Sequence, residues 1–464
     1  MARVAIIGAG QAGLLAAHDL LRHGYDVTVY SDKTPEQFLA DARPTGNASR
    51  YDMALDYERQ LGLAHWEREA PIANGIFATI VPAPEVQLLT TIGRMSKPSY
   101  AIDVRLQSAR WMEDLEERGG RVSIENVSFE RLDEIAAEND LTLVAVGKQA
   151  SRLFARDDRR STYPEPQRNV ALVNLTGVSQ SVPYAAAQDL FPIKVNIYPE
   201  WGEAFWIPWF SKDGLHCRSL VFSAKPGGPI DRFGSLADGA EAVATALEVI
   251  REIAPWDYDW FKDGELPDEN AWLVGRVLPI VRDVVGTLPS GRQVMALGDT
   301  AQTLDPIGGQ GANNGNKMAR SFVESVVEAG EGPFDAEWMR GAFDRFWARH
   351  HDIDVWNNML LDGPPPSGVD YLMAAYGATG RSDDDSPQQR LADAWAENWS
   401  DPAELTEDFF DPERVRARIA AAFGGSAEAA IMHGKLEVSR QQLRQQTGLA
   451  PKHPGPSVPP TTSF

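Results

Sequence analysis

Residues 4–13 read Val-Ala-Ile-Ile-Gly-Ala-Gly-Gln-Ala-Gly, and the apolar helical pattern of residues 14–21 follows directly. A β-prone run that ends in Gly-x-Gly-x-x-Gly and passes into a helix is the context of a dinucleotide-binding fingerprint. Gly8 allows the tight turn, Gly10 lets the backbone approach a pyrophosphate, and Gly13 lets helix and strand pack closely. The N–H groups at the helix start would then bind the diphosphate. The stretch therefore predicts a nucleotide-binding α/β fold.

A second glycine-rich stretch follows the predicted strand 294–297. That strand ends at Gly298-Asp299, and a loop through Pro306 leads into Gly308-Gly309-Gln310-Gly311-Ala312-Asn313 at a helix start. The pattern resembles the second FAD motif of aromatic-hydroxylase-type flavoprotein monooxygenases. In that family the equivalent of Asp299 bonds the ribityl chain, and the glycine-rich helix start points N–H groups at the flavin N1–C2=O edge. Reduced flavin is negative there, and a helix N-terminus stabilises such charge by up to about 2 kcal/mol.

The FAD contacts that the two motifs predict form one list: Gly8, Gly10, Gln11, Ala12, Gly13, Gly298, Asp299, Pro306, Gly309, Gln310, Gly311, Ala312 and Asn313. The strand 26–30 adds a further position, since the acid that usually ends this strand bonds the adenosine ribose. Here Ser31 holds that place and Asp32 follows. We expect a weaker ribose clamp, or one that Asp32 supplies.

Composition and charge limit the classes of partner. The chain has 464 residues, 43% of them hydrophobic, and no run approaches the ~18 apolar residues of a membrane helix. Lys and Arg number 44 against 66 Asp and Glu, and the net charge of −22 argues against nucleic acid or an anionic membrane as partner. The single cysteine, Cys217, excludes a disulfide framework and a cysteine-rich metal site, so no metal is expected. Because residue 4 already begins a strand, we expect no signal peptide and a cytoplasmic protein.

The remaining patterns divide the chain. Residues 168–224 alternate strongly, which predicts an antiparallel sheet. The other predicted elements are a helix at 104–118, a buried strand at 142–146, a helix at 236–253, and helices over 335–423 broken at 363–366. We predict a Rossmann-like FAD-binding domain interleaved with an antiparallel β-sheet substrate domain, followed by a C-terminal helical segment, an α/β fold with an α+β insert of the aromatic-hydroxylase (GR2) type. The predicted boundaries are 1–75, 100–165 and 270–330 for the FAD-binding domain, 76–99 and 166–269 for the substrate domain, 331–430 for the helical region, and 450–464 for a disordered, proline-rich tail.

Within that class, residues 97–106, 144–148, 202–208 and 298–313 resemble the styrene and indole monooxygenases, and the likeness covers about residues 1–430. These are two-component enzymes whose epoxidase subunit takes reduced FAD from an NAD(P)H-dependent flavin reductase. The resemblance implies that reduced FAD and O₂ form a C4a-hydroperoxide, which epoxidises or hydroxylates a small aromatic alkene or indole-like substrate. It also implies Arg105, within 97–106, as an FAD contact. The family is often dimeric, so a homodimer is a further expectation.

The end of the strand 142–146 favours the two-component scheme. Self-sufficient aromatic hydroxylases carry an Asp-Gly pair there, which helps bind FAD and NADPH, whereas this chain reads Ala145-Val146-Gly147-Lys148. The sequence has no second Gly-x-Gly-x-x-Gly for a nicotinamide nucleotide. Two alternatives stay open. One is a self-sufficient NAD(P)H-dependent aromatic hydroxylase that binds NAD(P)H in a surface groove, and the other is a non-catalytic protein that resembles GDP-dissociation factors.

Two stretches carry the candidate catalytic and substrate residues. Residues 43–50 should lie over the flavin ring, where the family places an asparagine near the peroxide. We assign that role to Asn47, with Gly46 as the alternative position, and assign to Arg43 a contact with the peroxide or the flavin edge. A turn asparagine and a surface cation are the competing interpretations.

The predicted strand around residues 204–210 is the second stretch. Alternation sends Phe205, Ile207 and Trp209 to one face and Trp206 to the other. We expect the face with Phe205, Ile207 and Trp209 to line the substrate pocket, and an ordinary core strand is the competing interpretation.

Overall fold

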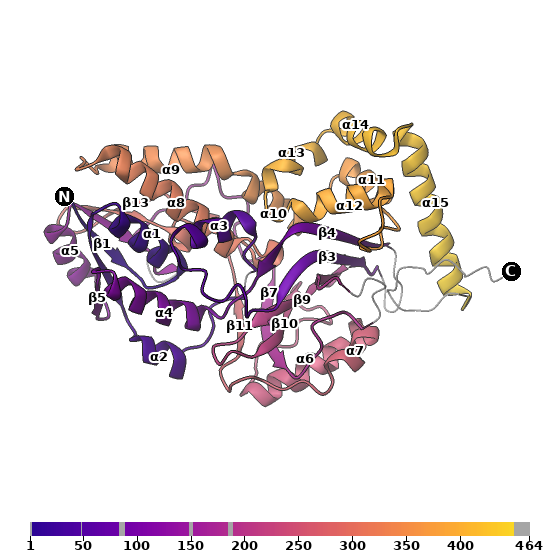
Figure 1. Cartoon of the computed structure of the whole chain (residues 1–464), viewed down its shortest axis with the longest axis horizontal. Coiled ribbons are helices and arrows are strands. Elements are labelled where there is room, and N and C mark those ends of the chain that lie inside the picture. Colours follow the sequence, from indigo (N-terminus) through magenta and orange to yellow (C-terminus); the bar gives the residue numbers. More distant parts are fainter. Residues whose placement is uncertain (1, 48, 83–88, 148–151, 184–188, 450–464) are drawn as a thin grey trace. The chain divides into compact units, whose positions relative to one another are not determined.

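The computed structural model describes residues 2–47, 49–82, 89–147, 152–183 and 189–449, and the chain divides into two compact units (Figure 1). Unit 1 comprises Met1–Glu69, Ile102–Gln167 and Val277–Asn357. Unit 2 comprises Ala70–Ala101, Arg168–Arg276 and Asn358–Phe464. The predicted disordered tail, 450–464, and Lys148 lie outside the described residues. The functional domain boundaries stay predictions.

Unit 1 contains a six-stranded sheet of order β13-β14-β6-β1-β2-β5. All neighbouring strands are parallel except β13 and β14, which are antiparallel. The central strand β1 is a continuous apolar run in which Val4, Ala5 and Ile6 have no exposed surface, as expected for a parallel strand that is covered on both faces. The strands are β1 (Arg3–Ile7), β2 (Asp26–Ser31), β5 (Arg121–Ile124), β6 (Leu141–Val144), β13 (Val285–Thr287) and β14 (Gln293–Ala296), with β12 (Ile280–Val281) and β15 (Gln302–Thr303) as a separate pair.

The helices of unit 1 pack their apolar faces against this sheet and against one another. Leu14 and Leu15 of α1 and Phe322 of α8 belong to the same buried cluster as the strands β1, β6 and β14. The helices are α1 (Gln11–Arg22), α2 (Pro35–Ala40), α3 (Asp52–Gln60), α4 (Val104–Glu117), α5 (Phe129–Glu138), α8 (Gly311–Ala329) and α9 (Ala336–His350), with short turns η2 (Gly298–Thr300) and η3 (Pro306–Gly308). The helix α10 (Asp352–Asp362) begins in unit 1 and continues into unit 2.

Unit 2 contains a seven-stranded sheet of order β11-β7-β10-β9-β8-β3-β4. Its neighbours are antiparallel except β3 and β8, which are parallel. The antiparallel part confirms the sheet predicted from the alternation of residues 168–224. The strands are β3 (Ile72–Ile80), β4 (Leu89–Tyr100), β7 (Asn169–Thr176), β8 (Ile193–Tyr198), β9 (Gly202–Phe210), β10 (His216–Ala224) and β11 (Trp272–Arg276).

Two groups of helices complete unit 2. The helices α6 (Gly239–Ile253) and α7 (Pro255–Phe261) share a buried cluster with Trp206 and Phe222 of the sheet. The second group is α11 (Pro366–Ala374), α12 (Pro387–Glu397), η4 (Pro402–Glu404), α13 (Thr406–Phe409), α14 (Pro412–Phe423) and α15 (Ala427–Gln446). The predicted break at 363–366 is confirmed, since α10 ends at Asp362 and α11 begins at Pro366.

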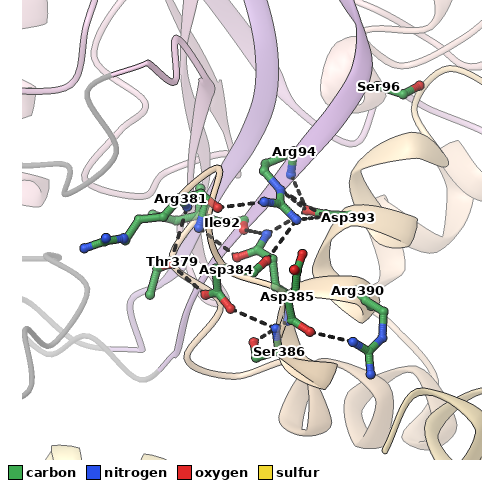
Figure 2. Close-up of polar contacts among 12 residues, drawn as sticks. Ile92, Arg94, Ser96, Thr379, Arg381, Asp384, Asp385, Ser386, Arg390 and Asp393 are labelled. Atoms are coloured by element: carbon green, nitrogen blue, oxygen red, sulfur yellow. Dashed lines mark hydrogen bonds and ion pairs between the residues drawn. The ribbon is translucent and has the colours of Figure 1, made fainter.

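Arg94 links α12, in the second group of helices, to the sheet of unit 2 (Figure 2). The Arg94 guanidinium of β4 bonds the Asp393 carboxylate of α12, with Nη2 at 2.6 Å and Nε at 3.0 Å from Oδ2. It also donates to the carbonyl oxygens of Arg381 at 2.6 Å and Asp384 at 3.1 Å. The backbones of β4 and α12 also lie close together, because a Cβ on Gly93 would lie 2.1 Å from the Ala392 carbonyl oxygen.

The helix α15 runs to Gln446, beyond residue 430, where the sequence predicts the helical region to end. Half of its buried residues are alanine or glycine, and a Cβ on Gly434 would lie 1.9 Å from the Met373 carbonyl oxygen of α11. A helix that packs through Ala430 and Gly434 lacks the stripe of large apolar residues from which helices are usually predicted. In the part of the chain that the structure describes, no helix combines the length and the apolar character needed to cross a bilayer.

Candidate functional site

The first glycine motif forms the turn between β1 and α1. Gly8 has a φ of 113°, and a Cβ there would lie 2.4 Å from the Ala145 carbonyl oxygen. A Cβ on Gly13 would lie 2.3 Å from the Gly8 carbonyl oxygen. Both positions therefore require glycine. In contrast, a Cβ on Gly10 would meet no heavy atom within 4 Å, so this backbone, at the N-cap of α1, borders open space where a pyrophosphate could approach.

The second glycine motif forms the start of α8. Asp305 caps the turn η3 by accepting from Ile307 N–H at 3.0 Å, Gly309 takes a left-handed conformation with φ of 61°, and Gln310 is the N-cap residue. The N–H of Asn314 donates to the Gln310 carbonyl at 2.8 Å, so the preceding N–H groups have no acceptor within the helix.

The N-termini of α1 and α8 both favour an anion. The first turn of each helix contains no acidic residue, and neither N-cap side chain makes a capping bond. The partial positive charge of a helix N-terminus is therefore not compensated locally at either position. This is the electrostatic condition for binding a diphosphate or an anionic flavin edge.

Ala12 brings the two motifs together, although they lie nearly three hundred positions apart in the sequence. A Cβ on Gly298 would lie 2.9 Å from the Ala12 Cβ, and one on Gly315 would lie 3.4 Å from it. Gly298 also has a φ of 61°. Around this contact Gly10 and Asp299 are exposed and Gln11, Ala12, Pro306, Gly309, Gly311 and Ala312 are half-buried, whereas Gly13, Gly298, Gln310 and Asn313 are buried. Accessible backbone at two helix starts, without carboxylates in the first turns, fits an FAD diphosphate and flavin ring.

The predicted catalytic loop is tied to the start of α8 by Asn313. The Asn313 carboxamide accepts from Tyr51 N–H at 2.9 Å and donates to the carbonyl oxygens of Ser49 at 2.9 Å and Gly309 at 3.0 Å. The side chain is thus bonded within the protein, while its backbone N–H lies in the first turn of α8, where it could serve a cofactor. Asn47 is buried and Arg43 is exposed. Their catalytic roles stay predictions.

A buried polar network links the end of this loop, at Arg50, to α3 and α8. No sequence motif predicts this network. Arg50 Nε lies 2.6 Å from Glu58 Oε1, and both side chains are buried. Asn316 of α8 donates to the same oxygen at 3.0 Å and accepts from Gln11. Burial raises the pKa of Glu58, and Arg50 opposes that shift. Gln11, a predicted FAD contact, therefore has a structural bond as well.

Arg105, the other predicted FAD contact of this region, forms a buried ion pair with Asp103. Its Nη2 lies 2.7 Å from Asp103 Oδ2, and its Nη1 donates to the Ala42 carbonyl at 3.3 Å.

Gln107 lies two residues after Arg105 on α4, and its carboxamide is buried. Neither its Nε2 nor its Oε1 has a hydrogen-bond partner among the described residues. Buried polar groups in native proteins are nearly always bonded, so Gln107 is a candidate ligand contact that the sequence analysis missed. The available signal was a glutamine on the same helix face as Trp111, one turn away.

Two further predicted contacts show how local bonds limit their roles. Ser31 Oγ donates to the Lys33 carbonyl at 2.7 Å, and the Asp32 carboxylate lies 2.5 Å from Lys33 Nζ on the surface.

Near the second motif, Arg282 Nη1 donates to the carbonyl oxygens of Asp299 and Thr300 at 3.1 and 3.2 Å. Burial lowers the pKa of Arg282, and the Asp299 carboxylate opposes this shift.

In unit 2 the alternation predicted for β9 is confirmed. Trp206 lies in the cluster that α6 and α7 cover, whereas Ile207 and Trp209 lie in a separate cluster with Ala101 and Cys217. Phe205 is buried and pairs with Val221 of β10 and Val195 of β8. The role of this face as a substrate pocket stays a prediction. Among the described residues, no group of three or more His, Cys, Asp or Glu side chains is placed to hold a metal ion.

Comparisons with known proteins show which proteins the chain is similar to. Residues 147–259 match the family model described as "Styrene monooxygenase A putative substrate binding domain". The chain is 27% identical over 423 residues to styrene monooxygenase StyA of Pseudomonas fluorescens, an alignment that covers 89% of this chain and 96% of the relative.

Solved structures show the same fold at lower sequence identity. A flavoprotein/dehydrogenase of Cytophaga hutchinsonii has a TM-score of 0.59 at 14% identity and covers 89% of this chain and 99% of its own. A triple mutant of the flavin-dependent brominase Bmp2 has a TM-score of 0.57 at 16% identity and covers 95% of this chain and 100% of its own. The fold is therefore the predicted mixed α/β fold of the aromatic hydroxylases. Together with the family model and the StyA alignments, it shows that the chain resembles the styrene monooxygenases, which are flavoproteins of this fold.

Proposed function

We propose that this chain is the oxygenase component of a two-component FAD monooxygenase that epoxidises or hydroxylates a small aromatic alkene or indole-like substrate. The observation that carries the proposal is the joined pair of helix N-termini at Gly10 and Gln310, neither of which has a carboxylate in its first turn. When bound in its reduced form, FAD supplies the electrons with which one atom of O₂ is transferred to the substrate.

The chain's own groups would bind and orient that cofactor. The open backbone at Gly10 and the start of α1 would hold the diphosphate. The start of α8 would stabilise the negative charge of the reduced flavin, and Gln107 would contact the cofactor with its buried carboxamide. The loop with Arg43 and Asn47, fixed by Asn313, would cover the flavin ring.

Substrate recognition would be apolar. Phe205, Ile207 and Trp209 share one face of β9 and would line a pocket that excludes water from the reacting oxygen. The names of the StyA relatives support an aryl alkene as the substrate class. The indole-like class rests on the sequence resemblance.

The end of β6 supports delivery of the flavin by a separate NAD(P)H-dependent reductase. The strand ends at Val144 and continues as Ala145-Val146-Gly147, with no acidic residue where self-sufficient hydroxylases carry Asp-Gly. Gly147 N–H instead donates to Thr300 Oγ1 at 2.9 Å. A self-sufficient enzyme is therefore the less favoured alternative.

The test supplies the purified protein with photoreduced FAD and oxygenated buffer in the presence of styrene or indole, and measures oxygenated product against H₂O₂. A parallel reaction contains oxidised FAD with NADH or NADPH and no reductase. We expect product in the first reaction and no nicotinamide oxidation in the second. Product formed from NAD(P)H by the protein alone would establish the self-sufficient alternative, and H₂O₂ without product would overturn the oxygenase assignment.

A further inference from the structure

Asn357 of α10 is a buried polar side chain that the proposed chemistry does not use. It has no exposed surface, and neither its Oδ1 nor its Nδ2 has a hydrogen-bond partner among the residues that the structure describes. An unbonded buried carboxamide loses its water without compensation, which is why such groups are rare in native proteins. The group therefore requires a partner that binding supplies, or an internal water.

The position of Asn357 links this group to the second glycine motif. A Cβ on Gly308 would lie 2.6 Å from Asn357 Oδ1, so the carboxamide lies directly against the second glycine motif. The same helix is joined to that segment one turn earlier, where Gln302 Nε2 donates to Asp354 Oδ1 at 3.3 Å. Gln302 in turn accepts from Asn314 Nδ2 at 3.1 Å. The helix α10 thus contacts this segment at Gln302 and at Gly308, and Gln302 links it to Asn314 in α8.

We propose that Asn357 is a positioning residue for the flavin site: its carboxamide becomes hydrogen-bonded when FAD binds, through the segment 306–310, and holds that segment against the cofactor. This inference rests on the proposed function, because it takes the segment to be flavin-facing. A carboxamide places an NH₂ donor group and a C=O acceptor side by side, which suits the alternating C=O and N–H groups of a backbone turn. Gly308 provides the space that the carboxamide occupies.

Removal of the Asn357 carboxamide should affect the stability of the FAD-free protein and the affinity for FAD in opposite directions. Asn357→Leu replaces both polar atoms by methyl groups and keeps the number and branching of the heavy atoms. If the carboxamide is bonded only in the loaded protein, the FAD-free variant should melt at the same temperature as the wild type or higher, because an unbonded polar group has been removed. The variant should nevertheless bind FAD about tenfold more weakly, since it cannot form the bonds that accompany binding.

Asn398 provides the matched control. It is equally buried, but its Nδ2 donates to Thr406 Oγ1 at 3.1 Å and its Oδ1 accepts from Leu405 N–H at 2.8 Å. Asn398→Leu should therefore lower the melting temperature of the FAD-free protein and leave the FAD affinity nearly unchanged. The measurements are differential scanning calorimetry without FAD and titration with oxidised and with reduced FAD.

Gly308→Ala gives a second measurement that does not depend on the leucine variant. Its Cβ would displace the Asn357 carboxamide, so it should weaken FAD binding in the wild-type background and much less in an Asn357→Ala background. The inference is overturned if Asn357→Leu behaves as Asn398→Leu does, which would indicate a static structural role or an internal water. A wild-type protein that binds no FAD would overturn the proposed function itself, a result distinct from the failure of Asn357 alone.

Discussion

Asn313 and Tyr51 lie 262 positions apart, and the Asn313 Oδ1 accepts the Tyr51 backbone N–H at 2.9 Å. The same carboxamide donates to Ser49 at 2.9 Å, so one side chain at the start of α8 fixes both sides of residue 50. The loop that carries Asn47 is thereby attached to the helix predicted to face the flavin. Burial also raises the pKa of Tyr51, whose hydroxyl stays protonated at any physiological pH.

Replacement of Asn313 tests this connection. Asn313→Ala removes the buried bonds of this carboxamide to Tyr51 N–H and to the Ser49 carbonyl, which should cost about 1–3 kcal/mol of unfolding free energy. FAD binding should weaken as well, because the loop loses its attachment. Urea unfolding and FAD titration measure the two effects. Asn139→Ala is a control at the C-cap of α5, where the side chain, among the residues that the structure describes, donates locally to the Ile135 carbonyl. Unchanged FAD binding in Asn313→Ala would show that the loop is positioned by other contacts.

The first glycine motif allows a sharper separation of folding from binding. A Cβ on Gly13 would lie 2.3 Å from a backbone oxygen, which cannot move aside, so Gly13→Ala should destabilise the protein by about 1–3 kcal/mol. A Cβ on Gly10 meets nothing within 4 Å, and the φ of −81° suits any residue. Gly10→Ala should therefore melt like the wild type but lose at least about tenfold in FAD affinity, equivalent to about 1.4 kcal/mol. Calorimetry and titration distinguish the variants, and normal FAD affinity in Gly10→Ala would place the diphosphate elsewhere.

These contrasts show where sequence reasoning succeeded. The roles of Gly8 and Gly13 follow from the local geometry of a strand, a turn and a helix, so a short window of sequence contains all the information required. The alternation of Phe205, Trp206, Ile207 and Trp209 is equally local, and the register of β9 confirms it.

Side-chain partners across long separations were not predictable. The bonds of Asn313 to residues 49–51 and of Arg50 and Asn316 to Glu58 depend on how α3 and α8 meet, which no local pattern specifies. Gln107 and Asn357 read as ordinary helix residues, and only their burial without partners marks them. The end of α15 was missed because Gly434 lies directly against the Met373 backbone, a contact that needs no large apolar side chain at that position.

The attachment of α12 to the sheet of unit 2 depends on the shape of Arg94. Its guanidinium bonds Asp393 and two carbonyl oxygens at once, which the single ammonium of lysine cannot reproduce. Arg94→Lys should therefore lower the unfolding free energy by about 1–3 kcal/mol although it keeps the charge. Limited proteolysis should also cut residues 379–393 faster. Arg440→Lys, on the exposed side of α15, should change neither measurement, and an equally stable Arg94→Lys would show that charge alone suffices.

The buried His18 predicts how stability depends on pH. Its Nε2 lies 2.8 Å from the Trp111 carbonyl oxygen, so that nitrogen carries the proton, and its Nδ1 faces Arg118 Nη1 at 3.2 Å. Burial, together with Arg118, lowers the pKa of His18 from 6.5 to about 4, and the bond to Trp111 only partly opposes this shift. The folded protein thus holds His18 neutral, while the unfolded chain takes up a proton below pH 6.5.

The contribution of His18 to the unfolding free energy is consequently fully present above pH 6.5 and is lost as the pH falls toward 4. The loss between pH 7 and pH 5 amounts to about 2 kcal/mol for His18. His350, whose pKa burial also lowers to about 4, adds a loss of the same sign. His18→Gln keeps a donor for Trp111 and an acceptor for Arg118 but does not titrate, so it should reduce the loss by about the His18 share. Urea unfolding at pH 7 and pH 5 tests this, with the exposed His433→Gln as the control that should follow the wild type. An unchanged slope in His18→Gln would mean that His18 is already charged in the folded protein.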